Sequence, residues 1–127
     1  LGELNMNEIT NTQIILKSRP IGMPAEDNFK VIKSNVPEVR NGEVLIKIIW
    51  LSLDPYMRGR MSDAKSYANP VSIGDVITGG AVGKIIKSSC SKFNEGDFVE
   101  GFTIGWQEYS VINSSLIRKH TAMQTYL

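Results

Sequence analysis

Cysteine and histidine are almost absent from this sequence. Its 127 residues contain one cysteine, Cys90, and one histidine, His120. A structural zinc site needs four nitrogen or sulfur ligands and a catalytic one usually three, so a zinc site is close to excluded and no metal is expected. The same scarcity argues against Ser/His/Asp and Cys/His catalytic systems. We expect Cys90 to be a small buried apolar group and His120 to lie on the surface.

Long apolar runs and blocks of like charge are also missing. The longest apolar run, residues 44–53, is interrupted by Lys47 and Ser52, whereas a membrane helix needs about 20 apolar residues. Fourteen basic and 13 acidic side chains give a net charge of +1, without the basic stretches that bind nucleic acid or membrane surfaces. Because a signal peptide is lacking and a lone cysteine forms no intrachain disulfide, we expect a cytoplasmic protein without nucleic-acid or membrane partners.

What the sequence does contain favours β structure. β-branched residues are plentiful, and glycine or proline interrupts nearly every 12-residue window, so helix signals are weak. The pattern predicts one mainly β domain, a partly open barrel or a sandwich, with under a fifth of its residues in helix. Six candidate strands are rich in Val, Ile, Phe or Tyr and end at turn residues: 12–16, 29–34, 44–51, 81–87, 98–100 and 108–112.

The strongest strand signal and the turn signals locate the centre of this sheet. Residues 44–50 have too little apolar-polar alternation for a strand with one solvated face, so we expect a central strand there. Gly42 follows an asparagine, and Gly74 and Gly96 each precede an aspartate. These dipeptides are typical of tight turns that need a positive φ.

A glycine-rich segment, residues 78–84, reads Thr-Gly-Gly-Ala-Val-Gly-Lys and raises the question of phosphate binding. It fails the P-loop pattern, because threonine stands at position 78 and Ile85 follows the lysine. It also runs into a candidate strand, whereas phosphate-binding glycine motifs run into a helix. We favour a structural role, in which the glycines let neighbouring strands approach closely.

Polar and aromatic residues are densest in residues 51–61, directly after the strongest strand. Pro55 cannot continue a hydrogen-bonded ladder, so the chain must turn, and Tyr56 supplies a hydroxyl on an aromatic ring. Loops that leave a rigid strand often carry function. The alternative is structural: an ordinary Asp-Pro turn, with the methionines filling gaps and the arginines solvated or paired with Asp63. The residues alone leave both interpretations open.

Several segments in a fixed order resemble a known family. Residues 52–62 read Ser-Leu-Asp-Pro-Tyr-Met-Arg-Gly-Arg-Met-Ser, and they are followed by Ser66-Tyr67, Gly79-Gly80, Gly-Asp-Phe-Val-Glu-Gly at 96–101 and Gly-Trp-Gln-Glu-Tyr at 105–109. This order resembles the zinc-independent medium-chain reductases, specifically the prostaglandin reductase and alkenal double-bond reductase branch, over about residues 11–119. Zinc-dependent relatives have a ligand cysteine near position 52 and Gly-His-Glu at 79–81, and this sequence has neither.

The resemblance implies a GroES-like β-barrel and NADPH-dependent reduction of the carbon-carbon double bond in an α,β-unsaturated aldehyde or ketone. It places Pro55 and Tyr56 beside the nicotinamide, Tyr56 also at the substrate, and Tyr67 on a loop near the substrate mouth. In such enzymes the main cofactor site lies in a following Rossmann domain, which these 127 residues lack. We therefore expect a flexible segment 1–11 and a substrate-side domain 12–127, inactive alone, from a longer enzyme that is compatible with a homodimer.

Two classes of function remain open at this stage. One is the substrate-side domain of an enzyme, and the other is a free-standing β-barrel that binds a partner or small ligand without catalysis. Residues 120–127 offer no turn, cap or stop signal, so the end of the sequence is typical of a cut through a structural element. This favours the enzyme domain, although the fold alone says little about function.

Overall fold

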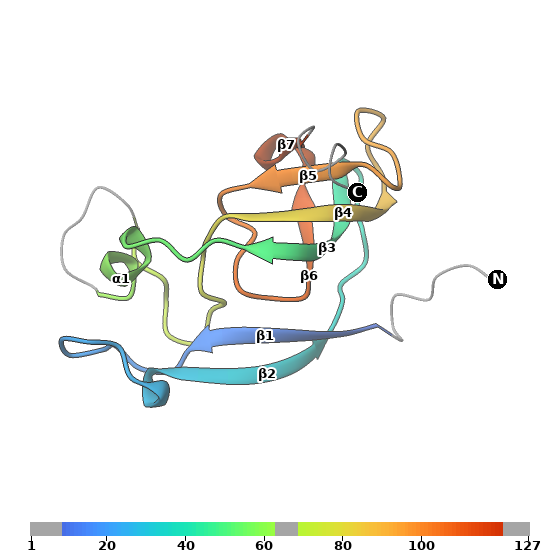
Figure 1. The fold of residues 1–127 in the computed structure, drawn as a ribbon. Helices are drawn as coiled ribbons and strands as arrows, with labels where there is room; N and C mark the ends of the chain where they lie inside the picture. The colour runs from blue at the N-terminus through green and yellow to red at the C-terminus, as the bar shows by residue number, and fades with distance from the viewer. Residues whose placement is uncertain (1–8, 63–68, 121–127) are drawn as a thin grey trace.

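The computed structural model describes residues 9–62 and 69–120, and strands dominate this part of the chain (Figure 1). No helix in these residues is long and apolar enough to cross a membrane. The elements follow in the order β1 (Thr10–Leu16), η2 (Glu26–Asn28), β2 (Phe29–Asn35), β3 (Glu43–Leu51), α1 (Tyr56–Arg60), β4 (Ala81–Ser88), β5 (Phe98–Gly101), β6 (Tyr109–Asn113), η3 (Ser114–Leu116) and β7 (Arg118–Lys119).

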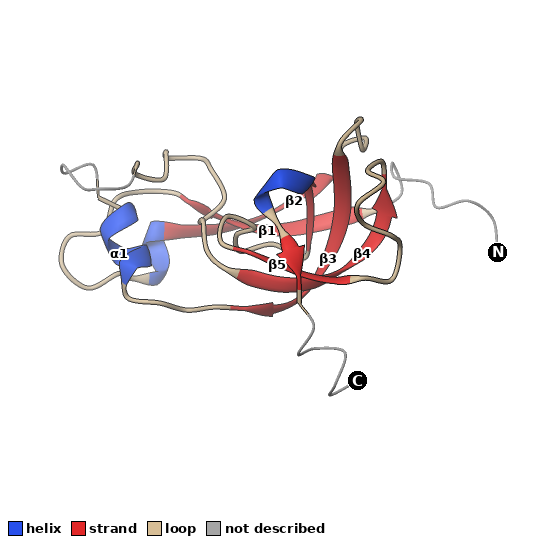
Figure 2. Cartoon of the chain, turned by 90° about the horizontal axis from the view of Figure 1, so that it is seen from above, coloured by secondary structure: helices blue, strands red, loops and turns tan. Residues whose placement is uncertain are grey.

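The strands form two antiparallel sheets that do not close on each other. One contains β1 and β2, and the other has the order β6-β3-β4-β5-β7. Isolated bridges join Gln13 to Gln107 and Ile15 to Val76, which ties β1 to the loops of the larger sheet. Figures 1 and 2 show the β1-β2 ribbon lying along the larger sheet, with α1 at one end of the molecule. The expected mainly β, partly open barrel is confirmed.

All six predicted strands are present, with ends within two residues of the prediction. β1 begins at Thr10, two residues before the predicted strand and inside the segment expected to be flexible. Asn11 is buried there, and its side-chain amide donates to the Gln107 side chain and to the Tyr109 carbonyl oxygen. These long-range hydrogen bonds extend the strand beyond its apolar residues, where sequence patterning gives no signal.

The short helix α1 was not predicted, because five residues are too few to display a helical period. Pro55 precedes it with helical dihedral angles, φ −57° and ψ −31°. Proline suits this position because the first helical N–H groups lack intrahelical partners in any case. The segment expected to be a loop after Asp54 therefore begins with one turn of helix.

Two hydrophobic clusters cover opposite faces of β3. Val44 and Ile46 belong to the main cluster, together with residues of β4, β5 and β6, whereas Leu45 packs with Val36 on the other face. All three β3 side chains are fully buried, so the central strand is confirmed for this half. The expectation is wrong for the second half, where Trp50 is 63% exposed. Pairing with β6 ends at Lys47, and beyond Ile48 the strand pairs with β4 alone.

The glycines act as the sequence predicted. Gly42, Gly74 and Gly96 have φ values of 84°, 95° and 93°, in the region that side chains rarely adopt. Gly83 meets a different need, since a Cβ atom there would lie 2.6 Å from the Lys47 carbonyl oxygen of β3. The close approach of β3 and β4 therefore requires glycine, which confirms the structural interpretation of this segment.

Candidate functional site

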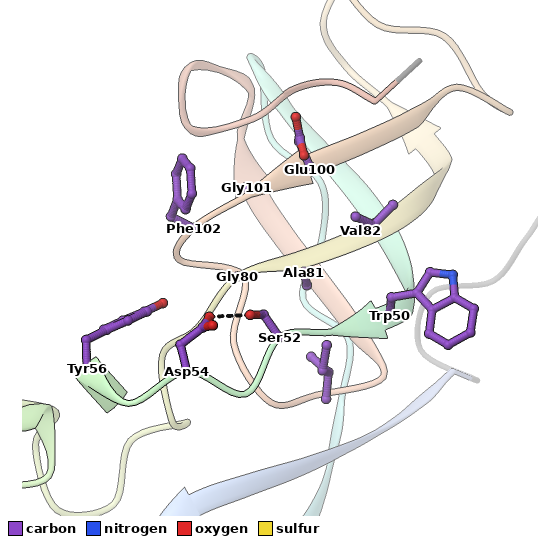
Figure 3. A pocket seen from close by; sticks show the side chains of 11 residues that line it. Trp50, Ser52, Asp54, Tyr56, Gly80, Ala81, Val82, Glu100, Gly101 and Phe102 are labelled. Atoms are coloured by element: carbon purple, nitrogen blue, oxygen red, sulfur yellow. Dashed lines mark hydrogen bonds between the residues drawn. The ribbon is translucent and has the colours of Figure 1, made fainter. Parts of the chain in front are cut away.

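A cavity of about 320 Å³ lies where β3 ends, β4 begins and β5 ends (Figure 3). The helix α1 forms its rim, through Tyr56. The complete lining is Trp50, Leu51, Ser52, Asp54, Tyr56, Gly80, Ala81, Val82, Glu100, Gly101 and Phe102. Three segments far apart in the sequence thus build one concave surface, and its size and mostly apolar lining are those of a small-molecule site.

Backbone hydrogen bonds shape the turn that carries Tyr56. After β3 the amide of Ser52 donates to the Gly80 carbonyl oxygen at 2.9 Å, which holds the exit of β3 against the start of β4. The Ser52 hydroxyl donates to the Asp54 carboxylate. The Met57 amide then donates to the Asp54 carbonyl oxygen at 3.1 Å and closes the turn into α1.

The sequence-predicted site residues have different places in the structure. Tyr56 is the first residue of α1, 36% exposed, and its hydroxyl points toward the side of the cavity where Gly80 lies (Figure 3). Pro55 is its exposed neighbour but does not line the cavity. Tyr67 lies outside the described residues. Of the two predicted residues that the structure describes, Tyr56 lines the cavity and Pro55 does not.

Sequence reasoning missed the two most exposed aromatic residues of the lining. Trp50 and Phe102 are 63% and 74% exposed, at the ends of β3 and β5. Exposed aromatic side chains that gather at one cavity are typical of a binding surface. A signal was present for Phe102, an apolar residue just beyond the Gly-Asp-Phe-Val-Glu-Gly segment, but nothing in the pattern distinguished Trp50 from a core residue.

The remaining side chains of the 51–61 run fulfil the structural interpretation in part. Met57 and Met61 are buried, as gap-filling residues should be. The arginines are neither free in solvent nor paired with a carboxylate in the described residues, and Asp63 lies outside them. They donate to backbone carbonyl oxygens: Arg58 to Pro20 and Gly22, and Arg60 to Asn69.

The charged lining residues of the cavity, Asp54 and Glu100, are both acidic. Burial raises the pKa of Glu100, but hydrogen bonds and positive charge from Arg118 and His120 outweigh this and hold it below its usual value. Glu100 Oε1 lies 2.6 Å from Arg118 Nε, and Oε2 lies 3.0 Å from His120 Nδ1. His120 is therefore partly buried, since it follows β7 and lies beside β5, and the expected surface position holds only in part.

Cys90 also differs from the expectation of a buried residue, since it is half-buried and packs against the main hydrophobic cluster.

Within residues 9–62 and 69–120, no three His, Cys, Asp or Glu side chains lie together as metal ligands would. The cavity therefore offers aromatic and aliphatic surface, one tyrosine hydroxyl, a Ser-Asp pair and an acidic rim, which suits a flat organic group better than an anion.

Comparison with known proteins assigns this arrangement to a family. Residues 12–119 match the family described as the N-terminal domain of oxidoreductase. The chain belongs to this family. Among curated relatives, it is 45% identical over 101 residues to the NADPH-dependent curcumin reductase of Escherichia coli, covering 80% of this chain and 29% of that protein. It is 44% identical over 110 residues to the NADP(+)-dependent 2-alkenal reductase of Nicotiana tabacum, covering 83% and 32%.

A solved structure of the same family has a matching fold. CurA from Vibrio vulnificus in complex with NADPH is 44% identical, with a TM-score of 0.78, covering 85% of this chain and 32% of that one. The chain thus spans about a third of the length of these relatives. The resemblance to NADP-dependent reductases, carried by several segments between residues 52 and 109, is confirmed at the level of the family.

Proposed function

We propose that this chain is the substrate-side domain of an NADPH-dependent reductase acting on the carbon-carbon double bond of α,β-unsaturated aldehydes or ketones. The observation that carries the proposal is the position of Tyr56, half-exposed at the rim of a mostly apolar cavity. The NADPH-dependent curcumin reductase and the 2-alkenal reductase among the relatives support the cofactor and the substrate class.

The lining of the cavity fits the nicotinamide end of NADPH and does not fit its phosphates. Trp50, Val82 and Phe102 present apolar surface on which a flat ring can pack. The two charged groups, Asp54 and Glu100, are acidic and repel phosphate. The pyrophosphate and the 2′-phosphate are therefore assigned to groups outside the described residues, and the domain by itself is expected to be inactive.

Hydride transfer requires that the nicotinamide ring and the enone be held in a fixed relative orientation. When bound, NADPH supplies a hydride for the β-carbon of the enone. Tyr56 would hold the ring and the enone in register, through its aromatic face and its hydroxyl, so that little orientational freedom is lost in the transition state. The hydrogen bond from the Ser52 hydroxyl restrains the rotation of the Asp54 carboxylate beside the cavity.

Substitution of Tyr56 in the full-length protein that contains this chain tests the proposal. Tyr56→Phe and Tyr56→Ala should lower kcat/KM for NADPH-dependent reduction of an enone by about 10- to 1,000-fold, which corresponds to about 1.4 to 4 kcal/mol of lost transition-state stabilisation. The phenylalanine variant tests the hydroxyl, and the alanine variant tests the ring. Steady-state kinetics with NADPH and a short-chain enal measures both.

The matched control is Tyr109→Phe, since Tyr109 packs against Val36 and Leu45, away from the cavity. It should leave kcat/KM unchanged. A buried aromatic residue costs about 3 to 5 kcal/mol of stability when truncated, so the urea midpoint is measured on the same variants. If Tyr56→Ala lowers the free energy of unfolding by that amount and leaves the activity per folded molecule unchanged, Tyr56 is a packing residue. If the wild-type protein binds enones without reducing them, the free-standing binding barrel is the better interpretation.

A further inference from the structure

Gly79 lies directly against the helix that carries Tyr56. A Cβ atom on Gly79 would lie 2.5 Å from Met57 Cε and 3.4 Å from Trp106 Nε1. The first distance is far below van der Waals contact. Gly79 is not among the positive-φ glycines of the described residues, so its backbone conformation is open to any residue. Glycine is therefore needed here because it has no side chain, and Met57 fills the space that a side chain would occupy.

Met57 links this space to Tyr56. It is 4% exposed and follows Tyr56 directly in α1. Its sulfur accepts a hydrogen bond from the Asp54 amide at 3.5 Å, and its own amide donates to the Asp54 carbonyl oxygen. Met57 therefore fastens both ends of the turn between Asp54 and α1, and a shift of its side chain is passed to the residue beside it.

Hydrogen bonds hold the backbone around Gly79. Its carbonyl oxygen accepts a hydrogen bond from the Gly105 amide at 3.0 Å, and the Gly80 carbonyl oxygen accepts one from Ser52 at 2.9 Å. An added methyl group at Gly79 therefore cannot be accommodated by moving this backbone without breaking hydrogen bonds. The end of the Met57 side chain is flexible and moves instead. We therefore expect the protein to remain folded while the position of α1 changes.

We propose that Gly79 is a positioning residue for Tyr56: its bare backbone seats Met57 and thereby sets how far α1 extends Tyr56 over the cavity. This inference rests on the role of Tyr56 in the proposed function. It is distinct from that role, because Gly79 does not line the cavity and would act through Met57, the side chain nearest to its Cβ position.

The test is Gly79→Ala in the full-length protein, with NADPH and an enal. We expect kcat to fall about tenfold while the KM for the enal changes by less than threefold, because a small displacement of a positioning group affects the transition state most. Met57→Leu removes the Cε atom and also the sulfur that accepts from the Asp54 amide, so the double variant is compared with Met57→Leu alone, and the two kcat values should agree within threefold. Gly59→Ala is the control: Gly59 lies in the same helix, is exposed, and has no atom within 4 Å of its Cβ position.

The outcomes separate this inference from the proposed function. A wild-type kcat for Gly79→Ala, beside an impaired Tyr56→Phe, overturns the positioning role and leaves the proposed function standing. A loss of the same size when Gly79→Ala is added to Met57→Leu also overturns it, because the contact with Met57 Cε is then not the one that matters. If the wild-type protein reduces no enone, the proposed function is wrong and the positioning role falls with it.

Discussion

The two halves of β3 are equally apolar and have opposite environments. Val44, Leu45 and Ile46 are fully buried between two clusters, whereas Trp50 and Leu51 are exposed and line the cavity. The first half pairs with β6 on one side and β4 on the other, and beyond Ile48 the strand pairs with β4 alone. Apolar residues of one strand thus stabilise the fold at one end and provide a binding surface at the other.

This difference has a consequence for mutation. A substitution in the buried half removes contacts that hold the sheet together, so its effect on the free energy of unfolding is large. A substitution in the exposed half removes surface that the folded chain leaves open to solvent, so its effect on stability is small. The two halves of β3 should therefore differ in how much a substitution lowers the free energy of unfolding.

The largest effect is expected where β3 and β4 approach most closely. In Gly83→Ala the new methyl group would lie 2.3 Å from Ile46 Cγ2 and 2.6 Å from the Lys47 carbonyl oxygen. The second atom is backbone and cannot move without disturbing the β3-β4 ladder. We expect a loss of at least about 3 kcal/mol in the free energy of unfolding, measured by urea denaturation.

Gly80→Ala is the control for this prediction. A Cβ atom there would lie 3.7 Å from both the Gly101 carbonyl oxygen and Ser52 Cβ, which is ordinary contact. Its stability should stay within about 0.5 kcal/mol of the wild type. Equal urea midpoints for the Gly80→Ala and Gly83→Ala variants would contradict the close approach of the two strands.

A matched pair of substitutions compares the two halves directly. Ile46→Ala should cost about 2 to 5 kcal/mol, because it opens a cavity in the main cluster. Trp50→Ala removes a larger side chain but should cost under about 1 kcal/mol, since that side chain is 63% exposed. Thermal or urea unfolding of both variants measures the ratio, and similar losses would show that the exposed half also belongs to the core.

The smallest effect concerns the ion-pair cluster at the edge of the cavity. The pKa of Glu100 is lowered in the folded chain, so its carboxylate adds stability above its ordinary pKa, and this contribution is lost as the pH falls through the folded value. Glu100→Gln should therefore destabilise the protein by under about 1 kcal/mol at pH 7, because Arg118 is largely exposed. The difference from the wild type should shrink below about pH 4.

The exposed Glu95→Gln variant is the control, since Glu95 forms no ion pair within the described residues, and its stability at pH 7 should match that of the wild type. The free energy of unfolding of the three proteins is compared from pH 7 to pH 3. A constant difference between Glu100→Gln and the wild type over this range would mean that the carboxylate charge has no part in holding β7 to β5.

Local signals in the sequence determined the strands and the turns. The β-branched runs and the glycines at 42, 74 and 96 act within a few residues, so the strand centres and the positive-φ turns followed from residue type. The family resemblance also depended on a contiguous run, residues 52–62, which includes Tyr56. These features could be predicted because each is encoded next to where it acts.

Only the tertiary structure decided which apolar residues face solvent and which residues form the site. Val44 and Trp50 look alike as strand residues, but the pairing with β6 ends between them and the register against β4 shifts just before Trp50. Glu100, Phe102 and His120 come near the cavity because β5 pairs with β4 and β7 pairs with β5. Such contacts depend on sheet order, and sheet order arises from the packing of the whole chain, which no local pattern encodes.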